Sequence, residues 1–200
     1  MTPVKVRRTC REETRLAIMA KADELFRQYG FEKTTVADIA RDLGMSTANI
    51  YKFFPSKQAI IESSAERNIA AIAESVSKVI RQLSGALEKM EGALLAIHRF
   101  HQEKLFRDRP RMVKLLMTAI DENWACVRRY DEFLLDTISQ IVQEGVTSGE
   151  FRVDNVRDTA QMVIRCLSLV IKPNLHSLHI PLDGEEWIRE QVQFVGRALR

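Results

Sequence analysis

Residues 34–54 read TTVADIARDLGMSTANIYKFF, and this segment is the most informative part of the chain. Thr35 and Asp38 have the spacing of a capping box, in which two side chains satisfy the free backbone N–H groups at the start of a helix. Gly44 follows the apolar stripe of that helix, where a left-handed residue ends it. Ser46 is placed to cap a second helix. Two short helices joined by a turn that contains Gly predict a helix-turn-helix.

The second helix would be the recognition helix, with the exposed residues of its N-terminal half facing base edges in a major groove. Thr47 and Asn49 can hydrogen-bond base edges, and the methyl group of Ala48 can contact a thymine methyl. The phenol of Tyr51 and the ammonium of Lys52 are both suited to phosphate oxygens.

Two residues at helix starts are further candidates for phosphate contact. The hydroxyl of Thr35 lies where backbone N–H groups and the helix dipole favour an anion. Lys57 occupies the first turn of the next helix, where the dipole disfavours a cation, and a nearby phosphate would explain its placement. The alternative reading is that Thr35 and Ser46 serve only as caps, and that Lys52 and Lys57 are only solvated.

The excess of positive over negative charge is confined to about the first quarter of the chain. Residues 1–57 carry 11 Lys and Arg against 7 Asp and Glu, whereas the remainder carries 19 against 20. This asymmetry favours a polyanion as the partner of the first part alone. Four basic residues precede the first expected helix: Lys5, Arg7, Arg8 and Arg11. They would form an arm that enters the DNA minor groove or follows the phosphates. The alternative is a disordered basic tail.

The rest of the chain is predicted to be helical. Gly and Pro leave long stretches of strong helix formers with apolar residues every three or four positions, and no segment alternates like a strand. We expect an all-α protein, with a helix-turn-helix domain over 1–55 and a larger helical bundle over 56–200. The expected helices cover roughly 12–29, 35–42, 46–53, 56–83, 87–107, 109–120, 122–147, 154–172 and 184–199.

The first part of the chain resembles the DNA-binding signature of the tetracycline-repressor (TetR) family from about residue 16 to 61. The matching positions are Leu25-Phe26, Gly30-Phe31, Thr34-Thr35-Val36, Ile39-Ala40, Gly44, Ser46, Ile50-Tyr51, Phe54 and Ser56-Lys57. The resemblance implies a three-helix DNA-binding head, a ligand-binding helical domain and a homodimer that usually represses transcription. It places Thr47, Ala48, Asn49 and Lys52 at the bases, and Thr35, Tyr51 and Lys57 at phosphates.

The last two expected helices offer a seam for the homodimer. Ala160, Val163, Leu167 and Val170 share one face of the first of them, and Trp187, Gln191, Phe194 and Ala198 share one face of the second. Two such helices from each subunit would make a four-helix interface about a twofold axis, and packing inside one chain is the competing explanation. Such a dimer would bind a palindromic operator.

A small-molecule effector is expected in the larger domain. His98 and His101 lie one turn apart on an apolar stripe, and the following helices supply further aromatic, Met and polar groups. The candidate lining residues are His98, His101, Met117, Trp124, Arg128 and Asp131, although the large apolar ones among them also suit a plain core. We expect no metal site at the two histidines, because no Glu-x-x-His occurs and no cysteine lies near them in sequence.

Two other classes of function remain as alternatives. One is an all-helical enzyme that uses His98, His101 or Cys126, and the other is a helical protein-interaction module. The enzyme is disfavoured because the chain carries no nucleophile elbow, P-loop, dinucleotide fingerprint or His-Glu-x-x-His, so no cofactor is expected either. The three widely spaced cysteines, and the lack of an apolar run long enough for a membrane span, predict a cytoplasmic protein with reduced thiols.

Overall fold

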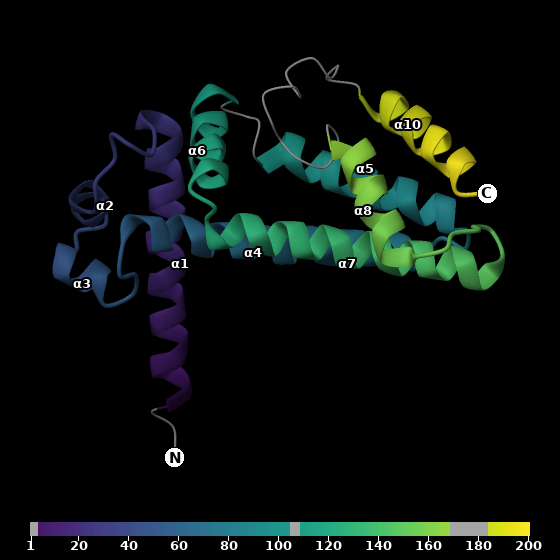
Figure 1. Ribbon diagram of the computed structural model, residues 1–200. Helices are drawn as coiled ribbons and strands as arrows, with labels where there is room; N and C mark the ends of the chain where they lie inside the picture. Colours follow the sequence, from purple (N-terminus) through teal and green to yellow (C-terminus); the bar gives the residue numbers. More distant parts are fainter. Residues whose placement is uncertain (1–3, 105–108, 169–183) are drawn as a thin grey trace.

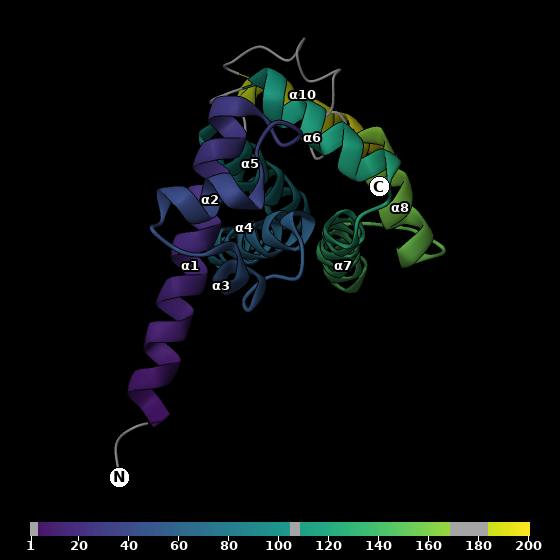
Figure 2. The same cartoon turned by 90° about the vertical axis from the view of Figure 1, so that its left-hand side faces the viewer.

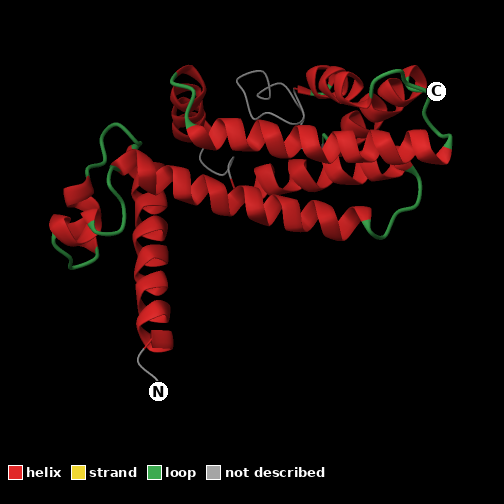
Figure 3. Cartoon of the chain, turned by 60° about the horizontal axis from the view of Figure 1, so that its bottom comes forward, coloured by secondary structure: helices red, strands yellow, loops and turns green. Residues whose placement is uncertain are grey.

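A computed structural model describes residues 4–104, 109–168 and 184–200, and these residues form helices and connections without any strand (Figures 1 and 3). The all-α prediction is therefore confirmed. The helices are α1 (Val4–Tyr29), α2 (Val36–Asp42), α3 (Thr47–Tyr51), α4 (Lys57–Ile80), α5 (Ala86–Lys104), α6 (Arg109–Asp121), α7 (Ala125–Ser148), α8 (Val156–Cys166) and α10 (Glu185–Ala198).

The first three helices and the first turn of α4 surround a core of their own. Ile18 and Phe26 of α1, Ile39 of α2, Ile50 of α3 and Ile60 of α4 are all buried in this head cluster. The apolar stripes predicted for the two short helices therefore face one shared core, as a helix-turn-helix requires.

The remaining helices form a bundle around a second core. Helix α5 lies inside it and packs against α4, α7 and α10, and α7 packs in turn against α8 (Figure 2). Met90 and Leu94 of α5 and Ile138 and Val142 of α7 are fully buried there. Helix α4 belongs to both parts, because Ile60 is buried in the head and Ile72 in the bundle. One rigid helix thus connects the two cores.

Helix α1 begins eight residues earlier than expected, at Val4 instead of residue 12. The basic positions Lys5, Arg7, Arg8 and Arg11 therefore lie on the helix and not on an arm before it. The physical reason is that no Gly or Pro interrupts the chain between Pro3 and Gly30, so the backbone is free to continue the helix. In Figure 1 this part of α1 projects away from the rest of the molecule.

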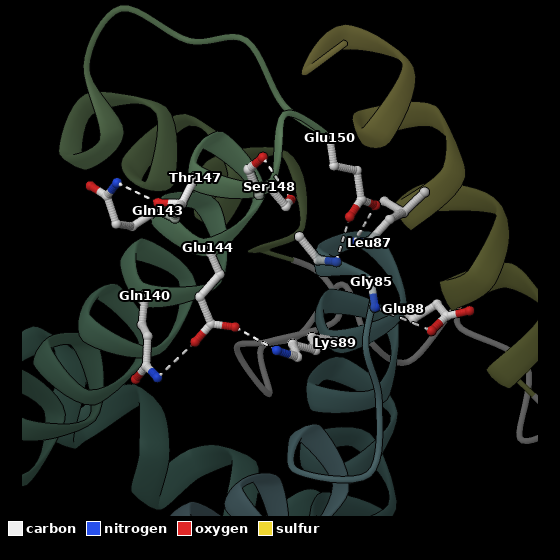
Figure 4. A network of polar contacts seen from close by, with 12 residues as sticks. Gly85, Leu87, Glu88, Lys89, Gln140, Gln143, Glu144, Thr147, Ser148 and Glu150 are labelled. Carbon is white, nitrogen blue, oxygen red and sulfur yellow. Dashed lines mark hydrogen bonds and ion pairs between the residues drawn. The ribbon is translucent and has the colours of Figure 1, made fainter.

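Polar contacts near the far end of the bundle fix α5 against α7 and the loop that follows it (Figure 4). The carboxylate of Glu150 accepts hydrogen bonds from the backbone N–H groups of Ala86 at 2.6 Å and of Leu87 at 2.9 Å. A residue from a distant segment therefore caps the N-terminus of α5. Lys89, one turn further on, forms an ion pair of 2.6 Å with Glu144 of α7.

We predict that Glu150→Ala lowers the free energy of unfolding by about 1.5–3 kcal/mol, because two partly buried N–H groups lose a charged acceptor. Thermal and urea unfolding monitored by circular dichroism measure the change. Glu88→Ala is the matched control, since Glu88 is exposed and its hydrogen bond to the N–H of Gly85 is long, at 3.4 Å. Equal losses in the two variants would contradict the capping role.

Candidate nucleic-acid interface and effector region

The predicted capping box and turn of the helix-turn-helix are present. The Thr35 hydroxyl accepts from the N–H of Asp38 at 3.1 Å, and the Thr35 N–H donates to the Asp38 carboxylate at 2.9 Å. The Thr35 hydroxyl in turn donates to the Asp38 carboxylate at 2.6 Å, and this hydrogen bond, followed by the one from the Thr35 N–H, holds the pKa of Asp38 below its ordinary value. Gly44 has a φ of 62°, a left-handed conformation that side chains disfavour. The Ser46 hydroxyl accepts from the N–H of Asn49 at 3.2 Å, so both short helices start at the predicted caps.

Helix α3 presents the predicted contact residues on its free side. Thr47, Ala48, Tyr51 and Lys52 are exposed, and Asn49 is partly so. Ile50, in contrast, is wholly buried and anchors the helix to the head core. The half-exposed Tyr51 is a large side chain without a place in that core, which leaves its phenol free to meet a ligand outside the protein.

Lys57 has partners inside the protein that the sequence did not reveal. Its ammonium donates to the carbonyl oxygen of Phe31 at 2.6 Å and to that of Thr34 at 2.9 Å. The same nitrogen lies 4.2 Å from the centre of the Phe31 ring, a cation–π contact. Burial lowers the pKa of Lys57. The cation therefore joins the start of α4 to the loop between α1 and α2.

Arg15 of α1 is a structural residue that sequence reasoning missed. Its guanidinium donates to the carbonyl oxygen of Phe53 at 3.3 Å and to the hydroxyl of Ser63 at 2.8 Å, and it lies 4.4 Å from the centre of the Phe54 ring. It thereby fastens the segment that follows α3. Its position in the sequence could have indicated this role. Arg15 lies one turn before Ile18 and Met19 on the same face of α1, and both of these residues are buried, so a solvated cation is not expected there.

Models of known protein families match both the head and the helical bundle of this chain. Residues 18–63 match a model described as bacterial regulatory proteins, tetR family, and residues 86–183 match one described as tetracyclin repressor-like, C-terminal domain. The chain belongs to the TetR family. The resemblance seen in residues 16–61 is thus confirmed, and this TetR-family protein is a DNA-binding transcriptional regulator.

Individual relatives and solved structures are consistent with membership of the TetR family. The HTH-type transcriptional repressor KstR2 of Mycolicibacterium smegmatis is 25% identical over 153 residues, which cover 74% of this chain and 72% of that protein. The fatty acid degradation regulator FadR from Bacillus halodurans shares the fold with a TM-score of 0.71 at 15% identity, covering 90% of this chain and 93% of that one. FadR of Thermus thermophilus, solved in complex with lauroyl-CoA, has a TM-score of 0.66 at 19% identity, covering 93% and 96%.

Two of the predicted effector-binding residues of this TetR-family protein lie inside its bundle. His98 and His101 of α5 are both buried, and Nε2 of His101 lies 3.2 Å from the hydroxyl of Tyr130 on α7. Burial lowers the pKa of His101 to about 3, and the nearby His98 acts in the same direction. Burial also raises the pKa of Tyr130, helped by Asp131. A neutral imidazole and a neutral phenol therefore meet between α5 and α7.

The other predicted effector residues lie elsewhere. Trp124 is buried at the corner between α6 and α7, in a separate cluster with Leu115 and Ala119, and its ring contacts Phe31 of the head. Arg128 is exposed and donates to the carbonyl oxygen of Asn123 in the same corner. Met117 is partly exposed on α6, and Asp131 lies next to Tyr130 on α7. The structure thus does not gather all six residues around one site.

The predicted dimer residues divide into two groups. Ala160, Val163 and Leu167 are buried in the core of their own chain, so their apolar surface is already used there, whereas Val170 lies outside the described residues. Phe194 of α10 is 64% exposed, Gln191 is partly exposed, and Trp187 packs partly against the bundle core. Met162 of α8, which the sequence pattern did not single out, is also 64% exposed.

None of the helices described is long and apolar enough to cross a membrane. Among the residues that the structure describes, no three His, Cys, Asp or Glu side chains are grouped closely enough to hold a metal ion.

We predict that Lys57→Met lowers the free energy of unfolding by about 1.5–3 kcal/mol, because two carbonyl oxygens lose a charged donor. Urea unfolding of the DNA-free protein is the measurement, since no phosphate is then present. Lys52→Met is the control: Lys52 is exposed, and its loss should leave stability within about 0.5 kcal/mol. A Lys57→Met protein as stable as the parent would show that the two contacts carry no stability.

His101 should make the protein less stable in mild acid. In the unfolded chain its imidazole takes up a proton below about pH 6.5, whereas in the folded protein its pKa of about 3 keeps it neutral. The unfolded state therefore binds more protons as the pH falls from about 6.5 towards 3, and stability falls by at most about 1.4 kcal/mol per pH unit. Urea unfolding at pH 7 and pH 4.5 should show a smaller decline for His101→Gln than for the parent. Equal declines would refute the assignment.

Proposed function

We propose that this protein is a homodimeric repressor that binds a palindromic operator through two copies of α3 and loses or gains affinity when a small molecule binds its helical domain. The observation that carries the proposal is the exposed face of α3, held on the head by two caps and by the buried Ile50. Recognition helices about 34 Å apart would enter successive major grooves on one side of B-DNA. With DNA as its partner, the protein is proposed to act in the cytoplasm.

The contacts to DNA follow from the chemistry and exposure of α3 and its neighbours. Thr47, Ala48, Asn49 and Lys52 are proposed to face base edges, with Asn49 the residue best able to form a bidentate pair, above all with adenine. The hydroxyls of Thr35 and Tyr51 are proposed to meet phosphates. Lys57 would act beside them mainly as a positioning residue, because its ammonium already holds two carbonyl oxygens of the head.

The dimer is proposed to form through α8 and α10. Phe194 and Met162 expose large apolar side chains, which a second subunit would cover, and Trp187 and Gln191 lie on the same side of α10 as Phe194. Two helices from each subunit would then form a four-helix interface. The domain division near residues 55–56 remains a proposal, with the first turn of α4 packed into the head.

The effector is proposed to bind inside the bundle near His98, His101 and Tyr130. These polar groups lie among apolar side chains, which is how small-molecule sites are commonly built. FadR of Thermus thermophilus, which shares this fold, was solved in complex with lauroyl-CoA, and that complex supports a small-molecule ligand for this chain. A differential affinity of about 1–3 kcal/mol for two arrangements of the dimer would be enough to control the operator.

A selection from a random duplex library, followed by titration of the enriched duplex, tests DNA recognition. We expect a Kd between about 10⁻⁸ and 10⁻¹¹ M, weakening steeply with salt, and a palindromic sequence. Tyr51→Phe should weaken binding about two- to tenfold on every duplex, because one phosphate hydrogen bond is lost. Asn49→Ala should instead change the preferred base at one position of each half-site.

Tyr29→Phe is the matched control for Tyr51→Phe. Tyr29 is 53% exposed and Tyr51 52%, but Tyr29 ends α1 and lies outside the recognition helix. Its affinity for the enriched duplex should equal that of the parent. A protein that enriches no sequence, or a Tyr51→Phe variant that binds like Tyr29→Phe, would refute the proposed interface.

A further inference from the structure

Phe31 joins the head core to the small cluster of Leu115, Ala119 and Trp124 at the corner between α6 and α7. It lies in the loop between α1 and α2, and its ring lies edge to face with Phe26 of the head core, the two ring centres being 5.3 Å apart. On its other side the ring lies 5.5 Å from Trp124, at an interplanar angle of 63°. The Lys57 ammonium at the start of α4 lies above the same ring. One side chain thus contacts the head, the connecting helix and the bundle.

The bundle side of this contact is firmly held. Trp124 is 4% exposed, its backbone N–H donates to the carbonyl oxygen of Ala119 at 2.9 Å, and its indole N–H donates to Glu122 at 2.7 Å. It immediately precedes α7 and packs against Leu115 of α6. Because the Trp124 backbone is hydrogen-bonded to α6 and its ring packs against Leu115 of that helix, a shift of α6 is expected to move the indole.

The head side is equally well connected. The carbonyl oxygens of Phe31 and Thr34 hold the Lys57 ammonium, and Thr34 is followed by the Thr35 cap of α2. Helix α2 packs in turn against α3. A displacement of Phe31 therefore reaches the recognition helix through one loop and one short helix, without crossing the bundle core.

A polar contact and a space lie beside the aromatic contact. Lys114 of α6 forms an ion pair of 2.8 Å with Glu32, the neighbour of Phe31, and both side chains are exposed. A pocket of about 200 Å³ is lined by Gly30 and Glu32 from the head and by Lys114, Leu115 and Thr118 from α6. The surface between α6 and this loop is therefore interrupted by a space beside the aromatic contact.

We propose that Phe31 is a positioning residue for DNA binding: its ring contact with Trp124, flanked by the Glu32–Lys114 ion pair, couples the effector domain to the orientation of α3. This inference rests on the proposed function and adds the residues that carry its coupling. It also predicts reciprocity, because two linked sites influence each other by the same factor. DNA bound at the head must therefore change the stability of the α6–α7 corner.

Hydrogen exchange with and without the enriched duplex tests this coupling, with no effector needed. In the parent, the duplex should slow amide exchange in α2 and α3 and also over residues 114–128, by about fivefold or more. Phe31→Leu should keep the slowing in α2 and α3 but lose it over 114–128. Phe31→Tyr, which keeps the ring, should retain both. Loss of the distant slowing in Phe31→Tyr, or its persistence in Phe31→Leu, would overturn the proposal.

A surface variant gives the same test without touching a packed ring. Lys114→Glu places two carboxylates opposite each other at the junction and should reduce the slowing over 114–128. Lys78→Glu is the matched control, because Lys78 is similarly exposed and is also paired with a glutamate, at 2.7 Å, but within α4. Equal effects of the two reversals would refute the junction as the route.

The outcomes also separate this inference from the proposed function. A parent protein whose α2 and α3 are not protected by any duplex refutes both. Protection confined to α2 and α3 in the parent refutes the coupling through Phe31 and leaves the DNA-binding function standing.

Discussion

The recognition helix has only five residues, and a helix of that length has no stability of its own in water. Its conformation depends on the hydroxyl of Ser46 and the left-handed Gly44 before it, and on the burial of its own Ile50 and of the following Phe54 in the head core. The long helix α1 supplies the surface on which this small unit is built. The packing of α3 against the head core therefore determines which of its side chains are exposed, and only the exposed side chains can contact DNA.

The same constraint explains how the molecule uses its cations. Arg15 and Lys57 are turned inward onto carbonyl oxygens and aromatic rings, where they join α1, the following loop and α4. Lys52 remains exposed beside α3. The positive charge of the first quarter thus has two roles, since part of it holds the head together and part is left for a polyanion.

Helix α4 and Phe31 connect the head to the rest of the molecule in two different ways. Helix α4 enters both cores as one rigid element, whereas Phe31 meets Trp124 at a junction with open space beside it. A regulator needs this combination, because a wholly rigid connection would leave no second arrangement and a wholly loose one would transmit nothing. The buried His101–Tyr130 pair lies between α5 and α7, and α7 begins directly after Trp124.

The sequence by itself determined the elements and the family. Local chemistry was sufficient for the capping box at Thr35, the stop at Gly44 and the cap at Ser46, because each depends on residues within a few positions of one another. Only the tertiary structure decided which cations are internal, that Trp124 faces the head and not the predicted effector residues His98 and His101, and that Val163 and Leu167 belong to the core. These outcomes depend on which distant helices meet. The period of a helix shows that a face is apolar, but it does not name the surface that covers it.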